Sequence, residues 1–201
     1  MDKRQVVVIH GGETFDTYNQ YLEALRSWEY DPMRPDYKDW KKRLPETLGE
    51  TFDVLRPSMP SKYNAKYEEW KIWFEKIVPY LRDGVVLVGH SLGGLFLAKY
   101  LSENDVPVRI SSTYLVAAPY AATDSITTLA DFALPNSLEK FSAQGGRIHL
   151  YHSTDDTVVP YSELSRYQAA LPHARASVFA DRAHFNQEEF PELVAEIMTN
   201  V

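Results

Sequence analysis

The 201-residue sequence contains no cysteine. This absence excludes disulfide bonds, thiolate metal sites and a cysteine nucleophile, so a nucleophile has to come from another residue type. Long apolar runs are absent as well. The strand-like segment Gln5–Ile9 is too short for the core of a signal peptide and far below the length that spans a membrane. We expect a cytosolic protein that does not enter membranes.

Positive charge is also scarce. Lysine and arginine number 21 against 28 aspartate and glutamate residues, which gives a formal net charge of -7. A polyanion would have to bind against this overall field, so we do not expect nucleic acid as a partner. The sequence has no dinucleotide fingerprint and no spaced set of metal ligands, and we expect neither a cofactor nor a metal.

Apolar side chains are plentiful. They make up 44% of the chain, and 13% of the residues are aromatic, which is typical of a folded protein rather than a disordered one. The length suits one sizeable core, and neither an internal repeat nor a low-complexity linker divides it. We predict a single domain over residues 1–201.

Six short apolar runs bounded by turn residues predict buried strands. Stretches with helical spacing separate them. Strands that alternate with helices predict an α/β fold, with a mostly parallel sheet of these strands and helices on both faces. The six runs are Val6–Ile9, Asp53–Leu55, Val85–Val88, Ser111–Ala117, Ile148–His152 and Ala176–Phe179.

Apolar residues at three- and four-residue spacing predict helices with one buried face. The clearest stripe covers Trp70–Leu81, where Pro79 should kink the helix or end it early. Similar stripes cover Tyr18–Leu25 and Phe190–Met198, and we interpret all of these as core contacts. The charged stretch Asp36–Arg43 is typical of a solvated helix face.

Two segments fit the alternation of strands and helices poorly. Trp28–Leu48 is rich in charge and proline, and Pro119–Gly146 lies between the fourth and fifth predicted strands. In parallel sheets the active-site residues gather at the carboxyl ends of the strands, next to such connections. We therefore interpret residues 28–48 and 119–146 as lid or pocket-wall insertions.

A Gly-x-Ser-x-Gly pattern at residues 89–93 directly follows a predicted strand and precedes a helical run. This is the setting of a nucleophile elbow, a strained turn that exposes a serine. Gly89 and Gly93 remove side chains that would collide with the neighbouring elements. Ser91 is the candidate nucleophile and the Leu92 N–H a candidate oxyanion donor. The alternative is that Ser91 only caps a helix.

A serine hydroxyl needs a base within hydrogen-bond reach and a third group that orients the base. Of the six histidines, only His184 follows the last predicted strand, in a loop from which its ring can reach the carboxyl edge of the sheet. We predict that it is the base, and the alternative is a surface side chain. His10, in the turn after the first strand, is expected to make structural hydrogen bonds.

The acid should follow the penultimate strand, where two aspartates are adjacent. One of the two is expected to close a turn through its side chain. We favour Asp156, four residues before Pro160, and keep Asp155 as the alternative.

A second oxyanion donor should come from the loop after the first strand. There His-Gly-Gly-Glu at residues 10–13 lets the backbone approach a substrate closely. The N–H of Gly12 is the favoured donor, and the N–H of Glu13 is the alternative. A simple glycine turn without a catalytic role would also explain the pair.

With these motifs the chain resembles the α/β-hydrolase superfamily, and most closely the small serine hydrolases related to retinoblastoma-binding protein 9. The resemblance rests on residues 86–93, 153–156 and 184–186, with the apolar helix that follows. It implies a three-layer α/β-hydrolase fold. In this fold the triad runs in the order serine, acid, histidine. The resemblance selects Asp156 as the acid and His184 as the base.

The implied activity is that of a serine hydrolase that cleaves small carboxylic esters, thioesters or amides through an acyl-enzyme. The chain departs from the small-hydrolase pattern in its His-Gly-Gly opening and in its extra residues between Trp28 and Leu48, so the resemblance does not extend to the pocket. The alternative function is a protein-interaction module with little turnover. A pocket for a modest apolar acyl or alcohol group is predicted from Phe15, Trp28, His90, Tyr120 and Phe185.

Overall fold

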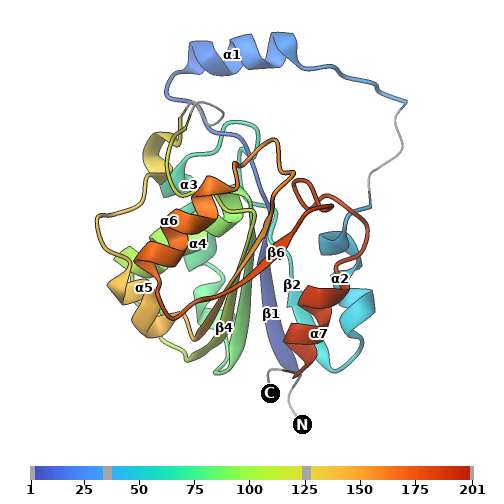
Figure 1. Cartoon of the computed structure of the whole chain (residues 1–201), viewed down its shortest axis with the longest axis vertical. Helices are drawn as coiled ribbons and strands as arrows, with labels where there is room; N and C mark the ends of the chain where they lie inside the picture. Colours follow the sequence, from blue (N-terminus) through green and yellow to red (C-terminus); the bar gives the residue numbers. More distant parts are fainter. Residues whose placement is uncertain (1–2, 34–37, 124–127, 200–201) are drawn as a thin grey trace.

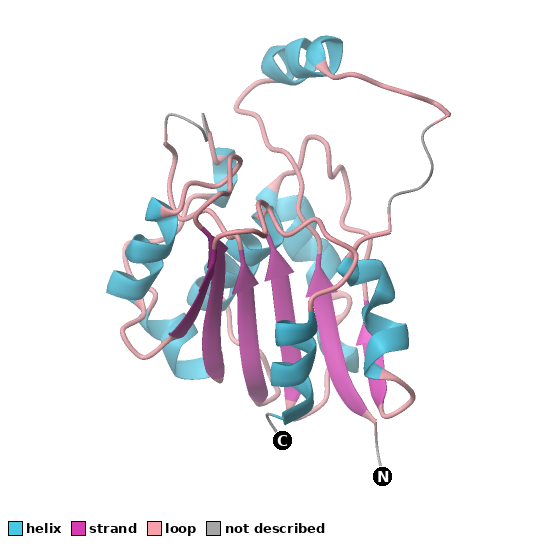
Figure 2. Cartoon of the chain, turned by 45° about the vertical axis from the view of Figure 1, so that its right-hand side comes forward, coloured by secondary structure: helices cyan, strands magenta, loops and turns pink. Residues whose placement is uncertain are grey.

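The computed structural model describes residues 3–33, 38–123 and 128–199. Within these residues one parallel sheet has the strand order β2-β1-β3-β4-β5-β6, and Figure 2 shows its strands side by side. Each strand overlaps one of the six predicted runs, so the strand predictions are confirmed. The strands are β1 (Arg4–Ile9), β2 (Phe52–Leu55), β3 (Val85–His90), β4 (Ile110–Val116), β5 (Arg147–Ser153) and β6 (Arg175–Phe179).

Helices cover both faces of the sheet, which gives the predicted three layers. Figure 1 shows α3, α4, α5 and α6 on one face and α2 and α7 on the other. Two short 3-10 helices, η1 (Val78–Tyr80) and η2 (Ala130–Phe132), lie in the connections. The α-helices are α1 (Tyr18–Ser27), α2 (Trp40–Leu48), α3 (Tyr67–Glu75), α4 (Leu92–Glu103), α5 (Glu139–Gln144), α6 (Ser162–Ala170) and α7 (Pro191–Thr199).

The sheet separates two apolar cores. Successive residues of a strand point to opposite faces, so Val7 packs in the core with Trp70, while its neighbour Val8 packs in the core with Trp40. Because both faces are covered, the central strands read as continuous apolar runs rather than alternating ones. This arrangement fixes the carboxyl ends of β1, β3 and β5 along one edge.

The helix predicted over Trp70–Leu81 ends early, as the proline suggested. α3 stops at Glu75, and Pro79 lies in η1. Trp70 and Phe74 are fully buried, as expected for the core stripe. Trp73 is 44% exposed, so this one member of the stripe faces solvent.

The apolar stripe of α1 is not a core contact, and that prediction was wrong. α1 contains no buried residue, Tyr18 is 66% exposed, and Figure 1 shows the helix standing apart from the three layers. Its formation depends on local signals instead. The Thr17 hydroxyl accepts the N–H of Gln20, whose side chain accepts the N–H of Thr17, a complete capping box.

The charged stretch 36–43 is more than a solvated helix face. Residues 36 and 37 lie outside the described residues. α2 begins at Trp40, where the Asp39 carboxylate accepts the N–H of Lys42 and caps the helix. Trp40 and Leu44 are buried in the core that α2 shares with α7, so only the outer face of the helix meets solvent. None of the helices in the described residues is long and apolar enough to cross a bilayer.

Candidate active site

Ser91 occupies a strained turn between β3 and α4. Its backbone has φ 54° and ψ -126°, a conformation that residues other than glycine rarely adopt. The Ser91 N–H donates to the carbonyl of Val116 on the neighbouring strand at 2.8 Å, which holds the turn in place. Strain of this kind costs about 1 to 3 kcal/mol and is usually found where function requires it.

The two glycines of the elbow are needed for close backbone approach. A Cβ on Gly89 would lie 2.5 Å from the carbonyl oxygen of Gly93, and a Cβ on Gly93 would collide with the carbonyl of Ile9 on β1. Neither neighbour is a flexible side chain that could move away. The pattern therefore has the steric role that the sequence predicted.

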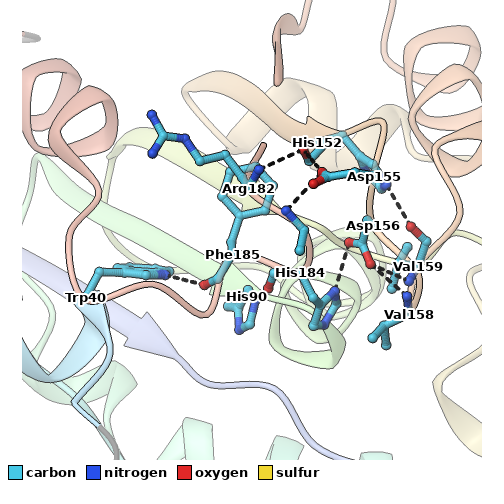
Figure 3. Close-up of polar contacts among 12 residues, drawn as sticks. Trp40, His90, His152, Asp155, Asp156, Val158, Val159, Arg182, His184 and Phe185 are labelled. Atoms are coloured by element: carbon cyan, nitrogen blue, oxygen red, sulfur yellow. Dashed lines mark hydrogen bonds and ion pairs between the residues drawn. The ribbon is translucent and has the colours of Figure 1, made fainter. Parts of the chain in front are cut away.

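His184 and Asp156 form a close pair beyond the ends of β5 and β6 (Figure 3). The Nδ1–H of His184 donates to Oδ2 of Asp156 at 2.8 Å. The other carboxylate oxygen accepts the N–H groups of Val158 and Val159 at 2.8 and 2.9 Å, and the aspartate side chain is fully buried. This arrangement fixes the imidazole tautomer and leaves Nε2 as the nitrogen that can take a proton.

The carboxylate of Asp155 makes different contacts from that of Asp156. Its carboxylate accepts the hydroxyl of Ser153 and, at 2.9 Å, the N–H of Ala183 in the loop that carries His184. The hydrogen bond from Ser153 lowers the pKa of Asp155. Spacing in the sequence alone did not decide which aspartate contacts the histidine. In the structure, Asp156 contacts the imidazole of His184 and Asp155 contacts the backbone of the loop.

The loop around His184 is held by two side chains from other elements. The Nε2–H of His90 donates to the carbonyl of His184 at 2.8 Å, and the Nε1–H of Trp40 donates to the carbonyl of Phe185 at 2.8 Å (Figure 3). Burial, and then the nearby Lys41, hold the pKa of His90 well below its usual range, so its ring is neutral. Sequence reasoning missed Trp40, because a single tryptophan in a charged stretch gives no signal of this contact.

The glycine loop after β1 lies beside Ser91. A Cβ on Gly11 would lie 3.0 Å from Cβ and 3.5 Å from Oγ of Ser91. The N–H of Glu13 donates to the carbonyl of Lys62 at 2.8 Å, so it is not available to an oxyanion and this alternative is excluded. The N–H of Gly12 is therefore the remaining candidate donor in this loop.

His10 fixes the orientation of that loop. Its Nδ1–H donates to the carbonyl of Gly11 at 2.6 Å, and its Nε2 accepts the N–H of Met59 at 2.9 Å. The Gly11 carbonyl and the Gly12 N–H belong to one trans peptide and point in opposite directions. By holding the carbonyl, His10 therefore sets the direction of the Gly12 N–H, which is the structural role expected of it.

Ser91 lies where two hollows of the surface meet. A large cavity of about 630 Å³ is lined by Ser91, His184 and His90, and a small pocket of about 140 Å³ is lined by Ser91 and Leu92. In the described part of the chain the Ser91 hydroxyl makes no hydrogen bond to the His184 ring. In such sites this contact often forms only when substrate is bound.

The predicted pocket residues are placed differently from one another. Phe15 lines the small pocket and His90 lines the large cavity. Tyr120 lines a neighbouring pocket that lacks Ser91, and Trp28 is 39% exposed with its ring centre 6.5 Å from that of Phe15. Phe185 is fully buried against other aromatic rings of the α7 core, because the loop turns it away from the cavity that His184 lines.

Both segments that interrupted the strand and helix pattern contribute to these walls. From residues 28–48, Asp39, Lys41 and Lys42 line the large cavity, and from residues 119–146, Pro119 and Leu129 line the small pocket. The cationic side chains were missed in the sequence, because exposed lysines are usually solvated surface residues. Among the described residues, no group of three or more histidine, aspartate or glutamate side chains is placed to hold a metal ion.

Comparison with known proteins yields one family and a common fold. The family described as serine hydrolase matches residues 30–193. The chain is 28% identical over 156 residues to serine hydrolase RBBP9 of Rattus norvegicus, an alignment that covers 77% of this chain and 80% of the rat protein.

Solved structures with low sequence identity share the fold. The ydeN gene product of B. subtilis has a TM-score of 0.74 at 17% identity, with 98% of each chain covered. The meta-cleavage product hydrolase of Pseudomonas fluorescens IP01 has a TM-score of 0.65 at 15% identity, covering 99% of this chain and 90% of that one. These similarities, together with the sheet order and the layers, establish the α/β-hydrolase fold that the sequence predicted.

Proposed function

This chain belongs to the serine hydrolase family, and from that premise we propose that it hydrolyses small carboxylic esters through a triad of Ser91, His184 and Asp156. The observation that carries the proposal is the hydrogen bond of 2.8 Å between His184 and Asp156, beside a cavity that Ser91 also lines. A nucleophile on an elbow, an imidazole of fixed tautomer and a buried carboxylate are the parts that acyl transfer by a serine requires.

In the first half of the reaction, Nε2 of His184 takes the proton of the Ser91 hydroxyl as Oγ attacks the carbonyl carbon. The carbonyl π electrons move to its oxygen, and the N–H groups of Leu92 and Gly12 bind this oxyanion. Asp156 stabilises the imidazolium. The tetrahedral intermediate then expels the alcohol, which takes its proton from His184, and the acyl group stays on Ser91.

In the second half, water takes the place of the alcohol. His184 removes a proton from the water, whose oxygen attacks the acyl carbon. Collapse of the second tetrahedral intermediate returns the proton to Ser91 Oγ and releases the carboxylic acid. Thioesters and amides follow the same sequence of steps, and esters are proposed ahead of amides because an alkoxide is a weaker base than an amide anion and needs less help from the general acid.

A series of para-nitrophenyl esters of increasing acyl length tests this function. We expect turnover of the shortest acyl chains, because the small pocket has a volume of only about 140 Å³, and we expect its loss in Ser91→Ala. Ser162→Ala, at the exposed start of α6, is the matched control and should retain the wild-type rate. Hydrolysis by Ser91→Ala at the wild-type rate would contradict the proposal.

A protein-interaction module is the second candidate, and one observation favours it. α1 buries none of its residues, and Tyr18 on it and Tyr30 beyond it are 66% and 87% exposed. A stoichiometric protein partner together with an absence of esterase turnover would favour this function over hydrolysis.

A further inference from the structure

Four cationic side chains line the large cavity, whereas the chain as a whole carries a formal charge of -7. They come from separate parts of the chain: two from α2, one from the segment after β2 and one from the loop before α3. Two carboxylates, from Glu13 and Asp39, line the same cavity. The cavity wall is therefore positive in a negative molecule. The cationic residues are Lys41, Lys42, Arg56 and Lys62.

Part of this charge is neutralised within the wall. The ammonium group of Lys41 lies 2.8 Å from a carboxylate oxygen of Asp39, and its side chain is 12% exposed. Burial lowers the pKa of Lys41 and raises the pKa of Glu13, so it disfavours the charged form of one group of each sign. Arg56 and Lys62 remain at the exposed rim, where they add to the positive side of this balance.

The small pocket that Ser91 also lines has no cationic residue in its lining. Six of its lining residues have apolar side chains, and its one charged lining residue, Glu13, is shared with the large cavity. Its volume of about 140 Å³ is less than a quarter of that of the large cavity, which is about 630 Å³. The apolar lining residues are Phe15, Leu92, Pro119, Leu129, Val158 and Val159.

The position of His184 indicates which part of an ester would bind in the large cavity and which in the small pocket. His184 lines the large cavity and not the small pocket. In the proposed reaction the alcohol oxygen takes its proton from His184, so the alcohol lies on the side of the imidazole. The alcohol portion then occupies the large cavity, and the acyl portion occupies the small pocket.

We propose that the substrates are short-chain acyl esters whose alcohol portion carries an anionic group, a carboxylate or a phosphate. This inference rests on the proposed esterase function and adds the substrate class to it. The small pocket, which has no cationic lining residue, admits a short acyl chain, and the cationic wall of the large cavity binds the anion. A cavity walled by one sign of charge also raises the local concentration of oppositely charged substrate, and salt screens this effect.

A pair of esters that differ in charge tests the inference. para-Acetoxybenzoate is anionic and para-acetoxybenzamide is neutral, and para-acetoxyphenyl phosphate distinguishes phosphate from carboxylate. Each rate is divided by the rate of hydroxide-catalysed hydrolysis of the same ester, which removes the difference in leaving group. We expect kcat/KM to be about tenfold higher for an anionic ester, with the advantage falling in about 0.5 M sodium chloride.

Charge-removing variants connect that preference to the cavity. The double variant Arg56→Gln, Lys62→Gln should lower kcat/KM about fivefold or more for the anionic esters and by a clearly smaller factor for the neutral ester. Lys76→Gln, just after α3 and outside the lining of this cavity, is the matched control and should change neither rate. Equal losses for charged and neutral esters, or no loss in the double variant, would overturn the inference.

The outcomes also separate this inference from the proposed function. Turnover of the neutral ester that depends on Ser91 without a preference for the anions would retain the esterase and overturn the substrate class. Calorimetric titration with para-hydroxybenzoate and para-hydroxybenzamide does not require turnover. Selective binding of the benzoate without any ester turnover would support an anion-binding cavity and contradict the esterase, whereas neither binding nor turnover would overturn both.

Discussion

The ring of His90 donates a hydrogen bond to the main-chain carbonyl of His184 at 2.8 Å, and the ring of His184 donates to Asp156 at 2.8 Å. The residue before the candidate nucleophile therefore holds the candidate base through its backbone, while the acid holds it through its side chain. Ala183 and Phe185, on either side of His184, have positive φ angles of 44° and 52°. A strained loop of this kind keeps its shape only if such contacts hold it.

His90→Ala removes the contact to the His184 carbonyl without replacing any residue of the proposed triad. We expect kcat to fall about tenfold, because the imidazole of His184 loses its alignment. His173→Ala, an exposed histidine between α6 and β6, is the control and should keep the wild-type kcat. Steady-state kinetics would decide, and an unchanged kcat in His90→Ala would show that the contact does not position the base.

The burial of the His90 ring also predicts how the stability of the fold depends on pH. Because desolvation lowers the pKa of His90 well below the usual 6.5, the unfolded chain binds a proton that the folded chain excludes. The titration of His90 should therefore leave the free energy of unfolding unchanged above the usual pKa of 6.5 and decrease it as the pH falls below 6.5. His10 and His152 also have lowered pKa values and contribute in the same direction.

Urea unfolding of the wild type and His90→Gln at about pH 7.5 and pH 5.5 tests this. The wild type should lose stability between the two values, and the variant should lose less. A loss of equal size in both proteins would assign the pH dependence to other groups.

The two adjacent aspartates should respond differently to the same substitution. Asp156→Asn should lower kcat by about 10³- to 10⁴-fold with the fold intact, because the amide cannot stabilise the imidazolium and can hold the wrong tautomer. Asp155→Asn should mainly reduce stability, because it weakens the contacts to Ser153 and Ala183. Kinetics and thermal unfolding of both variants distinguish these effects. A larger loss of kcat in Asp155→Asn would reverse the assignment.

Two glycines near Ser91 should also differ in their response to alanine. Gly89→Ala places a methyl group 2.5 Å from the backbone of Gly93 and should destabilise the fold. Gly11→Ala places it 3.0 Å from Cβ of Ser91, a contact that a small shift can relieve, so we expect a folded protein with lower kcat/KM. Circular dichroism and kinetics check both results. A stable, fully active Gly89→Ala protein would contradict the close packing of the elbow.

The sequence predicted the sheet well, because apolar runs buried on both faces are a strong local signal. It failed for α1, where the same helical spacing of apolar residues occurs although no residue of the helix is buried. Spacing shows that a helix has an apolar face, but not which part of the chain covers that face.

Part of the candidate site was likewise predicted from the sequence and part was not. Order along the chain and placement after strands indicated Ser91 and His184, since both follow from how a parallel sheet positions its carboxyl ends. The choice between Asp155 and Asp156 depends on the direction of each side chain in one turn, which spacing does not encode. The contact of Trp40 with the His184 loop joins residues 145 positions apart, and no local pattern predicts it.

Covalent labelling with a fluorophosphonate tests the central claim most directly, because this probe reacts with a serine only when a neighbouring base activates it. Peptide mass spectrometry of the labelled wild type should find one adduct, on Ser91. Labelling should disappear in Ser91→Ala and become much slower in Asp156→Asn. A wild-type protein that stays unlabelled, or an adduct that persists in Ser91→Ala, would contradict the assignment of Ser91 as the nucleophile.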